Sequence, residues 1–439
     1  MTLLLDAVYL LLALLASPYI LFRMARSRRW RAGLAQRLGF IPPRSGGRPC
    51  VWIHAVSVGE VSASRTLIDR ILKEHPKWEL RISTTTDTGQ RLAAGHYGAE
   101  RCFYFPLDLS TAVRRAFRRV RPDVIVLVEL EVWPNFVRLA RSRNVTVTIV
   151  NGRMREKWVG VYRRLGFLLR PLLDPAGPNL FCVQNETYRD RFVRAGFPAG
   201  KIRVTGTMKY DTVHMEADSA KLEPVRAALG LTTGERVWIA SCTWPGEEEV
   251  CLRVHKRLQQ QVPALRLIIA PRHIERADDV ARQIAQAGYE VRRRSAGGGP
   301  SGPAAVGLLD SVGELGYLYA IAEFVFMGKS LTARGGHNML EPAALGAVPV
   351  FGPLTDNFQE EAQLLLDAGA AERVADEAEL AETLLRLLRE PAVRRERARK
   401  GREAVLKRQG ASCRNMDVLS QAVASRMSDR GTTEVTRGR

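Results

Sequence analysis

The amino-acid sequence predicts an α/β protein with two doubly wound domains preceded by an apolar helix. Three observations predict this architecture. The 439 residues exceed what a single hydrophobic core usually organises. Short β-branched runs alternate with longer amphipathic stretches in both halves, which is typical of parallel sheets covered by helices on both faces. The third observation is a run from Leu3 to Phe22 that is almost wholly apolar.

The N-terminal run is long enough to cross a membrane. About 20 helical residues span the roughly 30 Å of hydrocarbon in a bilayer, and only Asp6 interrupts the run. No basic residue precedes it, unlike in a signal peptide. Basic residues instead follow it: Arg23, Arg26, Arg28, Arg29 and Arg31. We therefore expect residues 1–30 to form a single-pass anchor, with the rest on the cytoplasmic face of the membrane beside anionic lipids. A helix lying within one leaflet is the alternative.

Strand-like runs recur along the remainder of the chain. In the first half they are 50–57, 80–86, 102–106, 123–129, 145–150, 179–184 and 202–205, with helical patterns such as 61–73 and 112–120 between them. In the second half they are 236–241, 265–270, 304–309, 324–327 and 348–351. We expect a first domain over 31–211, a linker over 212–234, a second domain over 235–427 and a disordered polar tail over 428–439. In such domains ligands bind at the carboxyl ends of the strands.

Composition narrows the function classes. The net charge of +20 favours acidic partners, namely nucleic acid, anionic lipid or phosphorylated substrates, unless it reflects a genomic preference for arginine. Aromatic residues make up only 7%, which disfavours nucleic-acid binding through a basic stripe with interleaved aromatics. The six cysteines include no C-x-x-C pair, so no zinc or redox site is expected. The Walker A and G-x-G-x-x-G patterns and an Asp-x-Asp metal triad are also absent, and we expect no metal.

Two acidic motifs follow strands of the first domain. Glu60 closes the segment HAVSVGE directly after the first strand. It either acts as a general base in a cleft or caps the next helix. Glu129 and Glu131 stand at i and i+2 of a strand end, where side chains point to the same side. They either form a carboxylate site or pair with arginines at the surface.

Two further motifs of the first domain carry positive charge. Asn151 begins the segment NGRMR, in which Arg153 and Arg155 either hold a phosphate or start a solvated basic helix. Lys209 lies in the segment GTMKYD. Lysine is scarce in this arginine-rich chain, so Lys209 points to a place that needs a compact charge, although a surface lysine is the simpler interpretation.

The second domain carries three clusters, PRH at 271–273, DSVGEL at 310–315 and GGHNMLEP at 335–342. A glycine pair that leads into a helix start is suited to bind a phosphate. Glu341 is placed to accept hydrogen bonds from a ribose. His337 is a competing catalytic candidate, but it more simply orients the loop.

Taken in order, these motifs resemble the Kdo transferases, enzymes that move 3-deoxy-D-manno-octulosonic acid (Kdo) from CMP-Kdo to the lipid A precursor in lipopolysaccharide synthesis. The resemblance extends to about residue 400 and keeps the order of the motifs. It implies a GT-B fold with two domains facing a cleft and an inverting transfer to lipid IVA. It also implies that Glu60 is the catalytic base and that Glu131 and Lys209 stabilise the transition state. The implied contacts of CMP are Pro271, Arg272, Val312, Gly313, Glu314, Asn338, Met339, Leu340 and Glu341.

Four positions depart from the pattern of that family. In the segment 242–248 the family usually has Ser-Thr-His-x-Gly-Glu-Glu, whereas this chain has Cys242 in place of serine and Trp244 in place of histidine. Lys329 stands where the family has a second glycine, and Arg155 where serine often follows the Asn-x-Arg motif. The alternative enzyme class is another GT-B glycosyltransferase or epimerase that uses a uridine nucleotide. A membrane-tethered nucleic-acid-binding protein is the alternative outside enzymes.

Overall fold

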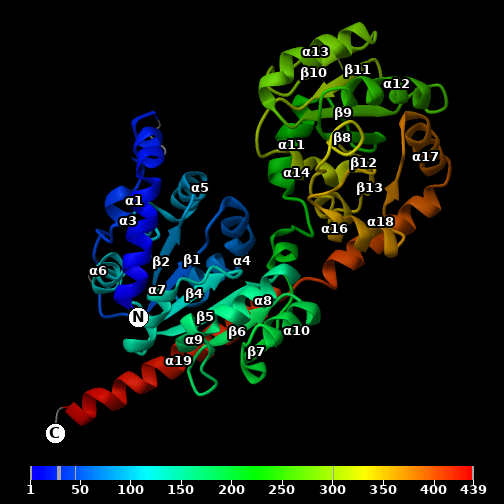
Figure 1. Ribbon diagram of the computed structural model, residues 1–439. Coiled ribbons are helices and arrows are strands. Elements are labelled where there is room, and N and C mark those ends of the chain that lie inside the picture. Colours follow the sequence, from blue (N-terminus) through cyan, green and yellow to red (C-terminus); the bar gives the residue numbers. More distant parts are fainter. Residues whose placement is uncertain (1, 27–30, 45, 300, 438–439) are drawn as a thin grey trace. The chain divides into compact units, whose positions relative to one another are not determined.

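The computed structural model describes residues 2–26, 31–44, 46–299 and 301–437, which form two compact units. The first unit comprises Met1–Thr212 and Gln409–Arg439, and the second comprises Val213–Arg408. Each unit contains one parallel sheet with helices on both faces, as Figure 1 shows. The predicted α/β class with two doubly wound domains is therefore confirmed.

The first unit has a seven-stranded sheet in the order β3-β2-β1-β4-β5-β6-β7. Its strands are β1 (Cys50–His54), β2 (Glu79–Thr84), β3 (Cys102–Tyr104), β4 (Val124–Val128), β5 (Thr146–Gly152), β6 (Leu180–Val183) and β7 (Ile202–Val204). Its helices are α1 (Thr2–Arg26), α3 (Leu34–Arg37), α4 (Val58–Glu74), α5 (Asp87–Tyr97), α6 (Ser110–Val120), α7 (Pro134–Ser142), α8 (Glu156–Leu165), α9 (Arg170–Leu173), α10 (Glu186–Arg194) and α19 (Ala411–Arg437). Three short 3₁₀ turns are η1 (Gly166–Leu168), η2 (Ala199–Lys201) and η3 (Met208–Thr212).

Strand β1 shows why its sequence is continuously apolar. Successive side chains of a strand point to opposite faces, and all five residues of β1 are buried. Trp52 packs on one face, edge-on to Phe136 at a ring-centroid distance of 5.1 Å. Val51 and Ile53 pack on the other face with Leu67 of α4. Both faces of the sheet thus carry a hydrophobic core.

The second unit has a seven-stranded sheet in the order β10-β11-β9-β8-β12-β13-β14. Its strands are β8 (Val237–Thr243), β9 (Arg266–Pro271), β10 (Glu290–Arg293), β11 (Ala305–Leu308), β12 (Ala322–Met327), β13 (Val348–Phe351) and β14 (Glu372–Arg373). Its helices are α11 (Ser219–Ala228), α12 (Glu247–Gln259), α13 (Ala277–Gln286), α14 (Leu315–Leu318), α15 (Leu340–Ala344), α16 (Gln359–Asp367), α17 (Glu377–Arg389) and α18 (Pro391–Leu406), with the 3₁₀ turns η4 (Ile274–Arg276) and η5 (Tyr319–Ile321).

Of the fourteen strands in the described residues, the sequence predicts twelve and misses β10 and β14. Both missed strands are edges of the second sheet. An edge strand has only one neighbour and can carry exposed polar residues, which removes the apolar run that marks a buried strand. Strand β10 has the sequence EVRR, and β14 consists of Glu372 and Arg373 alone.

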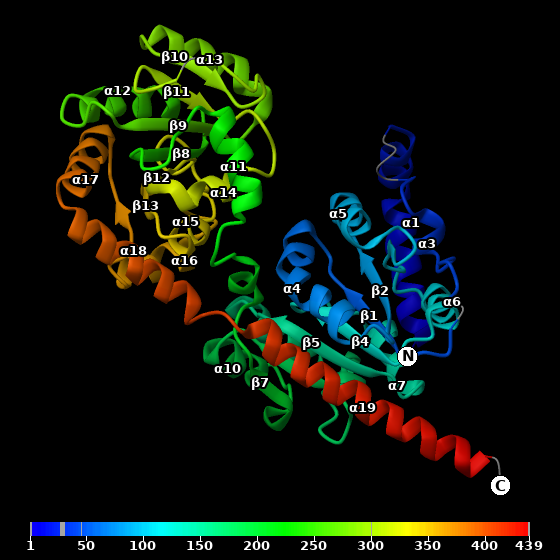
Figure 2. The ribbon, with the colours of Figure 1, turned by 180° about the vertical axis from the view of Figure 1, so that it is seen from behind.

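The C-terminal residues belong to the first unit, which differs from the expected boundaries. Residues 409–427 were expected in the second domain and 428–439 in a disordered tail. Helix α19 instead continues to Arg437 and packs Met416, Leu419 and Val423 into the core that α4 covers. Figure 2 shows α19 running along the first sheet. The expected linker forms α11 within the second unit. Residues 438 and 439 lie outside the described part of the chain.

One helix of the described residues is long and apolar enough to cross a membrane, over Thr2–Tyr19 of α1. Arg23 and Arg26 lie in its last turn. The expected juxtamembrane residues Arg28 and Arg29 lie outside the described residues.

Candidate active site

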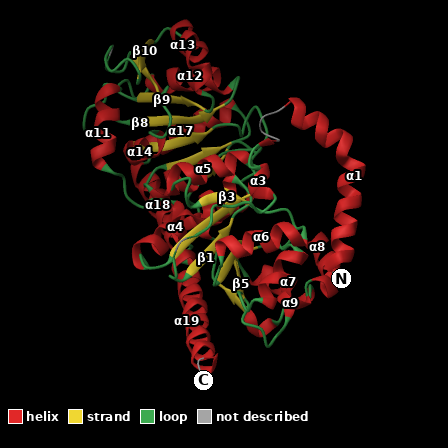
Figure 3. Cartoon of the chain, turned by 90° about the vertical axis from the view of Figure 1, so that its left-hand side faces the viewer, coloured by secondary structure: helices red, strands yellow, loops and turns green. Residues whose placement is uncertain are grey.

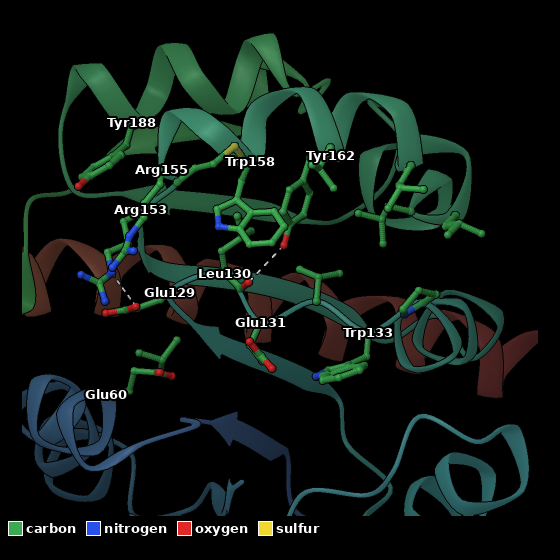
Figure 4. A pocket seen from close by; sticks show the side chains of 18 of the residues that line it. Glu60, Glu129, Leu130, Glu131, Trp133, Arg153, Arg155, Trp158, Tyr162 and Tyr188 are labelled. Atoms are coloured by element: carbon green, nitrogen blue, oxygen red, sulfur yellow. Dashed lines mark hydrogen bonds and ion pairs between the residues drawn. The ribbon is translucent and has the colours of Figure 1, made fainter. Parts of the chain in front are cut away.

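A pocket of about 690 Å³ lies in the first unit, where strands β1, β4 and β5 end. One part of its lining carries carboxylates: Glu60, Glu129 and Glu131. Another part is apolar or aromatic and comes from α8, η1 and the start of α1: Leu5, Tyr9, Trp158, Val161, Tyr162, Leu165 and Leu168. Figure 4 shows the carboxylates on one side and the aromatic side chains of α8 across from them. The pocket can therefore hold a ligand that is polar at one end and apolar at the other.

Glu60 lies in the first turn of α4. Its Oε2 accepts a hydrogen bond from the backbone N–H of Val56 at 2.8 Å, and its Oε1 accepts one from the Ser57 hydroxyl at 3.3 Å. Burial, opposed by the Val56 bond and aided by the charges of Glu129 and Glu131, raises the pKa of Glu60 to about 7. The two interpretations of Glu60 are thus compatible, because the side chain caps α4 and also lines the pocket. A pKa near neutrality suits a general base.

Glu129 and Glu131 have different surroundings, which corrects the expected arrangement. Strand β4 ends at Val128, and Glu129 has a left-handed φ of 64°, so the backbone turns away before the i, i+2 rule applies. Glu129 accepts a bond from Arg153 Nε at 2.7 Å, as the arginine-pairing alternative proposed. Burial raises the pKa of Glu131. Only Glu129 of the two is therefore ion-paired in the described contacts, while both line the pocket.

Of the residues in the two positively charged motifs of the first unit, some line the pocket and others do not. Arg153 and Arg155 line the pocket, and Arg155 stands at the N-cap of α8. Asn151 accepts a hydrogen bond on its Oδ1 from the backbone N–H of Met208 at 3.1 Å, which holds the start of η3. Lys209 lies exposed on η3 and is not among the pocket residues. The structure thus brings Glu60 and Glu131 together in this pocket, whereas Lys209 is not among its lining residues.

His54 has a structural place in the HAVSVGE segment. Its ring is fully buried, stacks on Phe105 at 3.8 Å between ring centroids, and contacts Ser83 through Nδ1. Burial lowers its pKa to about 3. This imidazole therefore stays neutral and serves packing.

The aromatic wall of the pocket was missed by the sequence analysis. Trp158, Val161 and Leu165 lie at i, i+3 and i+7 of α8, a spacing that places them on one helix face. Normally such a face packs inward, yet Trp158 is 47% and Leu165 44% exposed. The spacing could have predicted the apolar face, but only the structure shows that this face is left open.

The second unit gathers positive charge where β8, β9 and β12 end. Arg272 follows β9, and Lys329 follows β12 with its Nζ 4.6 Å from the centre of the Trp244 ring. His337 is half-buried, and its buried Nε2 has no hydrogen-bond partner among the described residues. Burial and the charges of Arg272, Lys329 and His273 lower the pKa of His337 to about 4. This cluster is suited to bind an anion. Trp244 and Lys329, two departures from the family pattern, touch each other.

The glycine pair does not form the expected phosphate cradle. The N–H of Gly335 donates to the Leu354 carbonyl at 2.9 Å, and that of Gly336 donates to the Lys329 carbonyl at 2.7 Å. Both amides are therefore used to close the loop. The following helix α15 has only five residues, too few for a substantial macrodipole. Side-chain cations, rather than these amides, supply the positive charge here.

The other predicted nucleotide contacts lie in three places at the carboxyl edge of the second sheet. Pro271 ends β9, and Val312 and Gly313 precede α14, with Val312 82% exposed. Glu314 is paired with Arg294 at 2.8 Å and accepts a hydrogen bond from the Ser311 hydroxyl. Burial raises the pKa of Glu314, but these two partners together lower it below its ordinary value. The Asn338 side-chain amide donates to Glu341 Oε1 at 3.0 Å, and burial raises the pKa of Glu341. The side chains of Met339 and Leu340 are buried, which leaves only their main-chain atoms for a ligand.

Glu247 holds the loop that carries Lys329. This fully buried carboxylate accepts hydrogen bonds from the backbone N–H groups of Lys329 at 2.7 Å, Ser330 at 3.1 Å and Leu331 at 3.0 Å. It also accepts one from Trp244 N at 2.9 Å. Because one buried carboxylate accepts from the backbone of both Trp244 and Lys329, it fixes the positions of these two residues relative to each other.

Comparisons with known proteins agree on one family. Residues 32–212 match the family model described as 3-deoxy-D-manno-octulosonic-acid transferase. The chain is 31% identical over 423 residues to the 3-deoxy-D-manno-octulosonic acid transferase of Haemophilus influenzae, which covers 94% of this chain and 97% of that relative. It is 34% identical over 377 residues to the protein of the same name from Bordetella pertussis, with 84% and 86% covered.

A solved structure supports the fold. The UDP-GlcNAc 2-epimerase from Neisseria meningitidis bound to UDP-GlcNAc aligns with a TM-score of 0.56 and 13% sequence identity, covering 85% of this chain and all of that one. At this identity the likeness concerns the fold alone. It confirms the predicted GT-B fold class.

Proposed function

The chain belongs to the 3-deoxy-D-manno-octulosonic acid (Kdo) transferases, a family of glycosyltransferases, and from this premise we propose its donor, acceptor and mechanism. The donor is CMP-Kdo, and the acceptor is the lipid A precursor lipid IVA, in lipopolysaccharide core synthesis. The reaction takes place at the cytoplasmic face of the inner membrane and inverts the configuration of the sugar.

The observation that carries the proposal is the two-sided pocket of the first unit. An acylated glucosamine disaccharide is polar at the sugar and apolar along its chains. The carboxylates Glu60 and Glu131 suit the hydroxyl-rich end, and the exposed face of α8 around Trp158 suits the acyl chains. Each CH₂ group removed from water contributes about 0.8 kcal/mol, so even a short stretch of acyl chain on this face would favour binding.

The proposed chemistry is a single displacement. The Glu60 carboxylate takes the proton of a glucosamine hydroxyl while the oxygen of that hydroxyl forms a bond to the anomeric carbon of Kdo. The bond from this carbon to the CMP phosphate oxygen breaks, and CMP leaves with the electron pair. A base with a pKa of about 7 is largely ionised slightly above neutral pH and still accepts a proton readily. We assign transition-state stabilisation to Glu131 and Lys209.

The donor site that we propose lies in the second unit. Arg272 and Lys329 supply positive charge that matches the negative charge of the CMP phosphate and the Kdo carboxylate. His337, whose pKa of about 4 keeps it neutral, lies beside them with its Nε2 open to a hydrogen bond from or to the donor. Preorganised cations stabilise the charge that develops on a leaving phosphate. Glu341, with Asn338 bonded to it, is placed as a ribose acceptor. We assign the remaining contacts of CMP to the other positions that the family motifs imply, namely Pro271, Val312, Gly313, Glu314, Met339 and Leu340. That the reaction needs no metal ion stays a prediction.

The test compares Glu60→Gln with Glu74→Gln, a matched change at the exposed end of the same helix. Lipid IVA and CMP-Kdo are incubated with each full-length protein, and the product is measured by mass spectrometry. We expect Glu60→Gln to reduce transfer by about 10²- to 10⁴-fold, the usual contribution of a general base, while CMP affinity stays within about twofold. Glu74→Gln should behave like the wild type. Turnover near the wild-type rate in Glu60→Gln would exclude Glu60 as the base.

A further inference from the structure

Helix α1 has an apolar surface that nothing in the described chain covers. Its large side chains are exposed on every side, for example Leu3 at 79%, Leu14 at 70% and Leu15 at 72%. Figure 3 shows its start beside α7 and its body away from the sheet. An exposed apolar surface of this kind marks a site for a membrane or another apolar partner.

The start of α1 is docked on the first unit by polar contacts. Asp6 Oδ1 accepts hydrogen bonds from the backbone N–H of Ser110 at 2.9 Å and from the side-chain amide of Asn135 at 3.0 Å. The Tyr9 hydroxyl donates to Asp108 Oδ2 at 3.1 Å. Asp108 itself accepts from the backbone N–H groups of Asn135 and Phe136. The Asp6 carboxylate thus accepts from a backbone N–H group at the start of α6, and the Asp108 carboxylate accepts from two at the start of α7. Hydrogen bonds from helix-start N–H groups to an ionised carboxylate are among the stronger hydrogen bonds in proteins.

The chain beyond α1 returns to the same place. The Arg37 carbonyl at the end of α3 accepts a hydrogen bond from the backbone N–H of Leu107 at 2.8 Å. Gln36 accepts one from the backbone N–H of Tyr104 at 2.8 Å. Leu107 precedes Asp108, to which Tyr9 is bonded. The segment from Tyr9 to Arg37 therefore begins and ends on the stretch between β3 and α6.

These contacts and a membrane crossing exclude each other. In a crossing helix Tyr9 would lie about 20 Å from Arg23, at 1.5 Å per residue, and thus deep in the roughly 30 Å of hydrocarbon. Asp108 and the two helix starts would have to enter the hydrocarbon with it, where charged groups are very unfavourable. If Tyr9 stays on the protein, only Leu10–Phe22 remains, about 20 Å of helix and too short to cross.

We propose that α1 lies in the plane of the membrane, within the cytoplasmic leaflet, with both of its ends on the cytoplasmic side. The partner of this surface is a phospholipid bilayer with anionic headgroups. Arg23 and Arg26 are exposed in the last turn, and a basic residue near such a surface contributes about 1 kcal/mol. This attachment stands independently of the proposed reaction.

The in-plane helix also borders the pocket of the first unit. Leu5 and Tyr9 line that pocket together with Trp158 and Leu165 of α8. Its apolar wall is thus continuous with a helix that contacts lipid. On the proposed function, an acyl chain passes from the leaflet to the pocket without crossing water.

The first test determines from which side of the membrane a cysteine at position 2 can be labelled. The protein is Thr2→Cys in a Cys413→Ser background, because Cys413 is the exposed one of the six cysteines. A membrane-impermeant maleimide is applied to cells with a permeabilised outer membrane and to inverted inner-membrane vesicles. Lys407→Cys, an exposed site in the second unit, marks the cytoplasmic side. We expect both cysteines to react only in inverted vesicles. Reaction of Thr2→Cys from outside, with Lys407→Cys unreactive there, would overturn the proposal.

The second test measures the docking itself and decides the matter if position 2 is poorly reactive. Thr2 and Ser142 border the same small cavity beside α6 and α7. In membranes that contain the Thr2→Cys, Ser142→Cys, Cys413→Ser protein, a flexible bismaleimide should join the two positions and change the mobility of the protein on a denaturing gel. The single Thr2→Cys protein is the control. A crossing helix would place Thr2 on the far side of the bilayer and give no linked product.

Discussion

Replacing Glu60 by glutamine should make the protein more stable, by an amount that depends on pH. The folded-state pKa of Glu60 is about 7, above the ordinary 4.5 of a glutamate. The folded state therefore holds its proton more tightly than the unfolded state. The contribution of this carboxyl to stability is most favourable at low pH and declines as the pH rises from about 4.5 to about 7. Glutamine cannot ionise, so the variant escapes this decline.

The magnitude follows from the two pKa values. One pKa unit corresponds to about 1.4 kcal/mol, and linkage between 4.5 and about 7 gives about 2.5 kcal/mol between pH 5 and pH 8. Solvent at the pocket mouth screens part of this, since Glu60 is half-buried, so we expect about 2 kcal/mol. Glutamine can still accept the hydrogen bond from Val56, which preserves the cap of α4. For a unit of this size the Tm should rise by about 4–8 °C more at pH 8 than at pH 5.

Thermal unfolding followed by tryptophan fluorescence measures this difference. Wild type, Glu60→Gln and Glu74→Gln are compared in the same detergent at pH 5, 6, 7 and 8. The Tm gain of Glu60→Gln should grow with pH and level off above pH 7, and Glu74→Gln should show no such trend. A Tm difference that stays constant with pH would refute the argument that burial raises the pKa of Glu60.

Two further predictions concern other parts of the protein. Glu247→Ala removes the buried acceptor of five backbone N–H groups, those of Trp244, Lys329, Ser330, Leu331 and Thr332. We therefore expect the free energy of unfolding to fall by about 3 kcal/mol or more. CMP binding, measured by calorimetry, should weaken at least about tenfold. Glu275→Ala, a change at an exposed glutamate of the same unit, is the control. Unchanged CMP affinity in a folded Glu247→Ala protein would contradict the proposal that the loop carrying Lys329 helps to bind CMP. Trp158→Ala should raise the KM for lipid IVA about tenfold with kcat unchanged, because it removes apolar contact area present in both ground and transition states. Leu406→Ala, an equally exposed apolar change in the second unit, should leave KM alone, and a loss confined to kcat in Trp158→Ala would argue against acyl contact.

The buried framework could be predicted from the sequence because parallel strands leave a strong pattern. Runs such as Val124–Val128 are apolar at every position because both faces of the sheet are covered. Motifs at the ends of such strands fall on one edge, which is why Glu60 and Glu131 could be expected to share a site. The short edge strands β10 and β14 escaped because polar residues are tolerated there.

Features that depend on distant contacts could not be predicted. Nothing in the segment around Met416 and Leu419 indicates which of two similar sheets it covers. The glycine pair at Gly335 and Gly336 is typical of a phosphate loop, but its amides are bonded to carbonyls whose positions only the folded loop defines. The run Leu3–Phe22 has the length of a crossing helix, and only the contacts of Asp6 and Tyr9 argue for another placement.

The position of α19 has a consequence for how the protein is made. The ribosome completes the first sheet at about Val204 but reaches Val423, which belongs to the core of that sheet, only after the entire second unit. At about 5–20 residues per second, this leaves the part of that core to which α19 contributes incomplete for roughly 10 to 40 s, although α4 and α5 already cover the rest. The unit whose synthesis begins first is thus completed last, and a nascent chain that stalls before residue 411 lacks the helix that buries this part of its hydrophobic core.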